Sequence, residues 1–109
     1  MDITVEQRTS YVLITPSGDV DLSTSRELQQ TIRMHMDKKP QRVVVDLAKV
    51  PYMDSSGVAT LVEAMQLARK QSTRLVLSAM QPKVRSIFEI ARLDRVFTIV
   101  ATLDDAAGA

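Results

Sequence analysis

The stretch from Val43 to Lys70 changes its hydrophobic period once, and this change constrains the fold more than any other feature. Val43 to Leu47 is an apolar run broken only by Asp46, which is typical of a strand covered on both faces of a parallel sheet. From Gly57 to Lys70, apolar residues recur at intervals of three and four, which predicts an amphipathic helix. The members of that stripe are Val58, Leu61, Val62, Met65 and Ala68. A buried strand followed by such a helix indicates an α/β protein.

The rest of the chain repeats this alternation after an opening pair of strands. Strands are predicted at 2–8 and 11–15, joined by a tight hairpin at Thr9 and Ser10, and further strands at 75–77 and 96–100. One helix is predicted from about residue 22 to 37, and another from Pro82 to Ala91. The first of these helices has the stripe Leu22, Leu28, Ile32 and Met36. Residues 104–107 form either a last helical turn or a frayed tail.

This order predicts an α/β fold in one domain over residues 1–109. We expect a mixed, mostly parallel sheet of four to five strands, with an N-terminal hairpin and helices packed against the sheet. A chain of 109 residues fits one domain with one hydrophobic core.

Composition excludes several classes of function. The chain has no cysteine, so disulfides and thiolate metal sites are impossible. The formal net charge is +1 with interspersed charges, and only two tyrosines and two phenylalanines are present, so a nucleic-acid partner is not expected. No apolar run reaches the eighteen or so residues of a membrane span, and the first residues lack an apolar signal region. We expect a cytoplasmic protein without a cofactor, since no glycine-rich phosphate loop is present either.

Two polar loops precede the first two predicted helices. Residues 17–21 form one loop and residues 49–56 form the other. Loops at the carboxyl ends of parallel strands meet at one edge of the sheet, so we expect their polar residues to gather there. We call this predicted group the acidic rim; it consists of Asp19, Asp21, Asp54, Ser55 and Ser56.

The serine pair at the start of the second helix has two interpretations. Asp or Ser at a helix start accepts a hydrogen bond from a free backbone N–H, so the sequence D-S-S-G at 54–57 can be an N-cap. A serine there can also accept a phosphate, because a helix N-terminus favours anions. Gly57 gives steric relief at the helix start, and we expect it to leave the neighbouring surface bare for a kinase.

Two further polar residues stand out. Asp46 lies in an apolar strand, where it either caps a neighbouring loop or orients the serine loop. His35, the only histidine, is expected at the edge of the core near the C-terminus of its helix, where a charged imidazole is favourable. It lies at the opposite end of that helix from the acidic rim, which excludes a serine hydrolase.

Three segments carry a resemblance to a known family. They are GDVD at 18–21, VVVDLAKVPYMDSSGVATL at 43–61, and VRSIFEIARLDRVFTI at 84–99. Together, in this order, they resemble STAS domains of the bacterial anti-sigma factor antagonist type. The resemblance implies a regulatory binding module in transcription control and signal transduction, and not an enzyme.

The resemblance also implies roles for individual residues. Ser56 corresponds to the phosphoacceptor, with Ser55 as the second choice. The implied partner is an anti-sigma factor that is itself a serine/threonine kinase, and a serine phosphatase is a further candidate partner. The expected partner-binding residues are Asp19, Asp21, Asp54, Ser55 and Gly57. The alternative is a constitutive STAS interaction subunit of a lipid-transport ABC ATPase complex.

Overall fold

The computed structural model describes all 109 residues and contains one five-stranded sheet in the order β1-β2-β3-β4-β5. The strands are β1 (Asp2–Gln7), β2 (Val12–Ser17), β3 (Arg42–Asp46), β4 (Arg74–Ser78) and β5 (Thr98–Val100). β1 pairs with β2 in antiparallel fashion, and every later pair is parallel. The predicted hairpin and the mostly parallel sheet are therefore confirmed.

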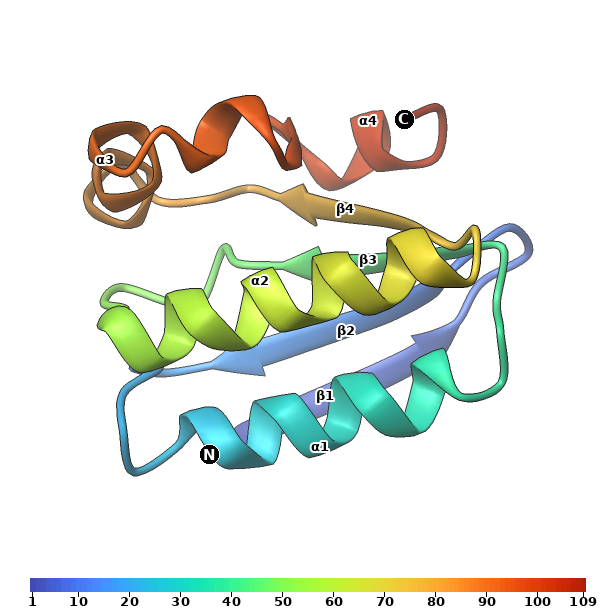
Figure 1. Ribbon diagram of the computed structural model, residues 1–109, viewed down its shortest axis with the longest axis horizontal. Helices are drawn as coiled ribbons and strands as arrows, with labels where there is room; N and C mark the ends of the chain where they lie inside the picture. The colour runs from blue at the N-terminus through green and yellow to red at the C-terminus, as the bar shows by residue number, and fades with distance from the viewer.

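The helices are α1 (Ser25–Met36), α2 (Ser55–Lys70), α3 (Pro82–Ile90) and the short α4 (Leu103–Ala106), with a 3-10 turn at Leu93–Arg95. α1 and α2 lie side by side across one face of the sheet, whereas α4 lies near the C-terminus over the last strands (Figure 1). The tail therefore forms the last helical turn that was one of its two expected states.

The main core lies between the sheet and the layer formed by α1, α2 and α3. The sheet contributes alternate residues of its central strands, and the helices contribute their apolar stripes. The fully buried helical members are Leu28, Ile32, Met36, Leu61, Val84 and Phe88. A smaller cluster on the opposite face of the sheet joins Leu13, Val44 and Val76 to Ala106 of α4. Because both faces of β3 are covered, its run of valines is continuous, as parallel strands require.

Most element boundaries differ from the sequence prediction by one or more residues, and three of these differences have a clear cause. α1 begins at Ser25, so Leu22 precedes the helix and is 82% exposed, and its assignment to the buried stripe was wrong. β5 is three residues long, because Val96 and Phe97 close the preceding 3-10 turn through hydrogen bonds to the Leu93 carbonyl. α2 begins at Ser55, two residues before the predicted start, because Asp54 caps it.

Candidate functional site

The two polar loops meet beyond the carboxyl ends of β2 and β3. Gly18, with a φ of +106° that a side chain would strain, turns the chain out of β2 and donates its N–H to the Lys49 carbonyl at 2.9 Å. The Val20 N–H then donates to the Tyr52 carbonyl, and the Asp54 N–H donates to the Val20 carbonyl, both at 3.0 Å. This short parallel pairing places the starts of α1 and α2 next to each other.

Asp54 is the centre of this site. Its Oδ1 accepts hydrogen bonds from the Ser56 N–H at 2.9 Å, the Gly57 N–H at 3.3 Å and the Ser56 hydroxyl at 2.6 Å. Its Oδ2 accepts from the Leu22 N–H at 3.2 Å, across the gap between the two loops. Asp54 is therefore the N-cap of α2, and it joins the helix start to the loop that precedes α1.

The second carboxylate of the rim is held inside its own loop. Asp21 Oδ1 accepts from the Ser23 hydroxyl at 2.6 Å and from the Ser23 N–H at 2.9 Å. The Thr24 hydroxyl donates to the Asp19 carbonyl at 2.8 Å, whereas the Asp19 side chain is exposed and makes no hydrogen bond. The charge of Asp54 has only a small influence on the pKa of Asp21, which it raises.

Both carboxylates remain ionised at neutral pH. The Ser56 hydroxyl is the main cause that lowers the pKa of Asp54 from its ordinary value, and the backbone N–H groups of Gly57, Ser56 and Leu22 add to it. The Ser23 hydroxyl and N–H lower the pKa of Asp21, while the nearby Asp54 charge raises it in part. Two of the three carboxylates of the rim, those of Asp21 and Asp54, are thus negative groups held in place by hydrogen bonds.

The two serines occupy different environments. Ser55 is exposed, and its side chain makes no hydrogen bond in the structure. Ser56 is half-buried, and its hydroxyl donates to Asp54. The N-cap interpretation therefore belongs to Asp54 rather than to either serine, which leaves both hydroxyls without a capping role.

Gly57 corrects one expectation. Its missing side chain would point into the interior, where a Cβ would lie 2.5 Å from Met53 Cγ and 2.8 Å from Val20 Cγ1. The expectation that Gly57 leaves a bare outer surface was wrong, and its steric role at the helix start is confirmed. A side chain here would separate α2 from the loop that carries Val20.

A groove beside Ser56 was missed by the sequence reasoning. It has a volume of about 450 Å³ and lies between the first turns of α1 and α2. Its lining includes Ser56, Ala59, Arg26 and the exposed Leu22. The sequence from Asp21 to Thr24 could have indicated this groove. It forms a turn before α1, so Leu22 is not part of the helical stripe and its side chain faces outward.

Asp46 and His35 lie outside the site. Asp46 Oδ1 accepts from the Ala48 N–H at 2.9 Å, so it caps the loop directly after β3 and makes no bond to the rim. Burial and the nearby Lys38 charge lower the pKa of His35, which opposes the charged imidazole that this end of the helix would favour, and its half-buried position agrees with the expected edge of the core.

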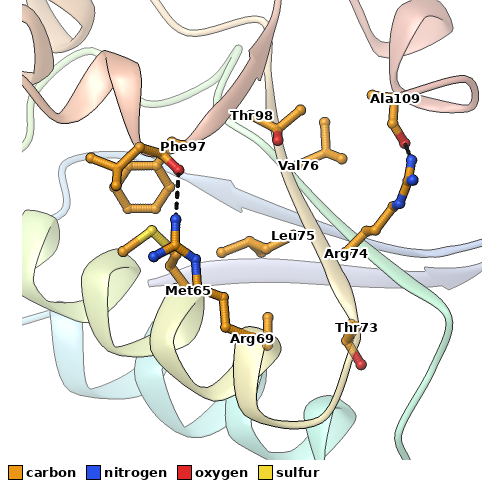
Figure 2. A pocket seen from close by; sticks show the side chains of 11 residues that line it. Met65, Arg69, Thr73, Arg74, Leu75, Val76, Phe97, Thr98 and Ala109 are labelled. Carbon is orange, nitrogen blue, oxygen red and sulfur yellow. Dashed lines mark hydrogen bonds between the residues drawn. The ribbon is translucent and has the colours of Figure 1, made fainter.

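A second cavity, of about 220 Å³, lies at the other end of the sheet (Figure 2). Met65, Leu75 and Phe97 form part of its apolar wall. Arg69 donates to the Val96 carbonyl, and Arg74 points the other way to donate to the Ala109 carbonyl. Because the two guanidinium groups diverge, they do not form a combined anion site. No group of three metal-ligating side chains is present, and no helix is long and apolar enough to cross a membrane.

Comparison with known proteins agrees with this architecture. The family model described as "STAS domain" matches residues 2–106, and the chain belongs to the STAS domain family. The putative anti-sigma factor antagonist BtrV of Bordetella bronchiseptica is 27% identical over 109 residues, covering 100% of this chain and 94% of that protein.

Two solved structures extend the comparison. An anti-sigma factor antagonist from Mycobacterium paratuberculosis has a TM-score of 0.90 and 27% identity, covering 98% of this chain and 91% of that chain. The Bacillus cell fate determinant SpoIIAA in its phosphorylated form has a TM-score of 0.76 and 21% identity, covering 98% and 97% of the respective chains. At that identity, the likeness to SpoIIAA shows the shared fold alone.

Proposed function

We propose that this chain is an anti-sigma factor antagonist that sequesters an anti-sigma serine kinase and is released when Ser56 is phosphorylated. The observation that carries the proposal is the position of the half-buried Ser56 hydroxyl, in the first turn of a 16-residue helix and in contact with the ionised carboxylate of Asp54, with the ionised Asp21 in the adjoining loop. The names of the curated relatives support the class of function.

The site favours a charge switch over a change of fold. A phosphoserine adds about −1.5 to −2 charges at neutral pH. On Ser56 this charge would lie against Asp54 and near the loop of Asp21, so the rim would become far more negative, while the dipole of α2 still favours negative charge at this end of the helix. A difference of a few kcal/mol at this surface changes partner affinity by two to three orders of magnitude.

The groove beside Ser56 provides the contact surface that such a partner needs. The Leu22 side chain is 82% exposed, and Ala59 lies on the first turns of α2 in the same groove. An apolar contact next to the phosphoacceptor would hold the kinase where its ATP can reach the hydroxyl. Arg26 and Glu63 border the groove and give it charges of both signs.

Phosphorylation mapping tests the proposal. The chain is incubated with ATP and the anti-sigma serine kinase of its own genome, and the modified serine is located by mass spectrometry. We expect phosphate on Ser56, none on Ser56→Ala, and normal modification of the matched control Ser55→Ala. Phosphate that persists at full level on Ser56→Ala would contradict the assignment.

Measuring complex formation with the kinase tests the second part of the proposal, that phosphorylation of Ser56 releases the partner. We expect the unmodified chain to co-elute with the kinase, and the phosphorylated chain to elute alone. Stable co-purification with an ATPase that Ser56→Asp leaves unchanged would instead support a constitutive subunit of a transport complex.

A further inference from the structure

The two adjacent serines differ in one physical respect that bears on which of them reacts. The Ser56 hydroxyl is held by a 2.6 Å hydrogen bond to Asp54, whereas the Ser55 side chain makes no hydrogen bond and is exposed. The side chain of Ser56 is therefore held in one rotamer, while that of Ser55 is free to rotate.

The acceptor of this bond is itself fixed. Asp54 Oδ1 is held by the N–H groups of Ser56 and Gly57, and Asp54 Oδ2 is held by the N–H of Leu22 from the other loop. Bonds to both oxygens prevent the carboxylate from rotating. The position of the Ser56 oxygen is thus determined by backbone atoms of two separate elements and not by Ser56 alone.

We propose that Asp54 selects Ser56 over Ser55 as phosphoacceptor, because it orients the Ser56 oxygen for attack and accepts the proton of that hydroxyl. This inference rests on the proposed function and adds to it the reason why one serine reacts. With its proton directed at Asp54, the Ser56 oxygen keeps its lone pairs free to attack ATP held by the kinase. Fixing an attacking atom before the reaction lowers the barrier, and a displacement of about 1 Å can cost about 100-fold in rate.

The chemical step balances with groups already named. Ser56 Oγ attacks the γ-phosphorus of ATP, a new O–P bond forms, and the bond from that phosphorus to the β–γ bridging oxygen breaks. ADP leaves with the bridging oxygen. The hydroxyl proton passes along the existing hydrogen bond to Asp54 Oδ1 and then to water. A weakly basic carboxylate suffices, because the transition state of phosphoryl transfer is loose and protein kinases use an Asp in the same way.

The first test uses the kinase that phosphorylates the wild-type chain. Asp54→Ala is expected to lower kcat by about 100-fold with KM changed by less than about threefold, since docking through Leu22 and the groove remains. The ratio of phosphate on Ser56 to phosphate on Ser55 should fall from strong preference toward parity. Asp54→Asn, whose amide oxygen can still accept the hydrogen bond of the hydroxyl but cannot take up its proton, should restore the preference for Ser56 without restoring the wild-type kcat.

Three possible outcomes of this test distinguish a failure of the role given to Asp54 from a failure of the proposed function. An unchanged kcat and an unchanged site ratio in Asp54→Ala would overturn the positioning role while leaving the proposed function intact. A loss confined to KM would also overturn it, because that result describes docking. Absence of phosphate from the wild-type chain would overturn both the proposed function and this inference.

A second measurement needs neither a kinase nor a variant. Side-chain couplings measured by NMR on the unmodified chain should show a single χ1 rotamer for Ser56 and rotamer averaging for Ser55. Equal averaging at both serines would overturn the proposal, even if Asp54→Ala failed to fold.

Discussion

At the scale of single residues, the Asp54 carboxylate alone has several roles that the sequence pattern assigned to more than one side chain. Asp54 caps α2, accepts the hydroxyl of Ser56 and bonds the N–H of Leu22. The sequence showed that an acidic residue or a serine would cap this helix. It could not show that the same residue also bonds the loop before α1, because that bond joins residues 32 positions apart.

The free energy of unfolding at acid pH should depend on the ionisation of Asp54. Its pKa is lower in the folded chain than the ordinary 3.8, because the Ser56 hydroxyl and three N–H groups favour the charged form. The unfolded chain therefore binds more protons as pH falls below about 5, so the stabilisation by Asp54 is complete above this range. It is lost as pH falls through 3.8 toward the lower folded pKa.

Urea unfolding between pH 7 and pH 3 measures this effect. Asp54→Asn should make the decline in unfolding free energy shallower than in the wild type. Asp19→Asn, in which the exposed carboxylate that is lost makes no hydrogen bond, is the matched control and should follow the wild-type curve. Identical slopes for all three proteins would show that the hydrogen bonds to Asp54 do not persist in solution.

At the scale of elements, the position of α2 depends on an absent side chain. Gly57 lies at the third residue of the helix, directly against Met53 and Val20. Alanine is normally the better helix former, by about 0.8–1 kcal/mol. Here its Cβ would lie 2.5 Å from Met53 Cγ and 3.1 Å from the Val20 carbonyl oxygen, so the backbone would have to move.

Gly57→Ala should therefore destabilise the fold despite its better propensity. Overpacking costs typically about 1–3 kcal/mol, which exceeds or cancels the gain from propensity. The matched control is Gly108→Ala, since a Cβ at Gly108 has no heavy atom within 4 Å. Chemical denaturation should show a loss for Gly57→Ala and little change for the control; a stabilised Gly57→Ala would mean that α2 shifts without strain.

The elements themselves were largely predictable, and the exceptions share a cause. The spacing of apolar residues alone distinguished the buried strand at 43–47 from the helix that follows, and Pro82 indicated the start of α3. Leu22 was misplaced because it continues a helical spacing, although the turn closed by Asp21 and Thr24 delays the start of α1 until Ser25. The inward direction of Gly57 depends on Val20, which belongs to another loop and is not visible in the local pattern.

At the scale of the whole molecule, the chain has little net charge to oppose a modification. A phosphate on Ser56 changes the formal net charge from +1 to about −1. All of this change falls on one edge of a molecule only 30 Å in its longest extent, beyond the carboxyl ends of β2 and β3. The modified edge is thus distinguished from the rest of the surface by charge rather than by shape.

If release of the partner is electrostatic, it should depend on ionic strength. The charges of the rim are exposed or half-buried, and the screening length falls from about 10 Å at 0.1 M salt to about 3 Å at 1 M. We expect phosphorylation to weaken binding of the anti-sigma kinase by about 100-fold at low salt, which is about 2.7 kcal/mol. Calorimetric titration at 0.05 M and 0.5 M salt should show this factor falling toward about tenfold or less as screening shortens the range of the repulsion.

The control for this measurement is a charge change at the other end of α1. Asp37→Asn alters the net charge by one unit but lies at the C-cap of that helix, remote from Ser56. This substitution should leave the affinities of the unmodified and the phosphorylated chain for the kinase unchanged, together with their salt dependence. The effect depends on where the charge lies and not on the net charge of the chain. A phosphorylation effect of the same size at both salt concentrations would show that the phosphate excludes the partner by its volume, and the fixed carboxylates of Asp21 and Asp54 would then have no part in release.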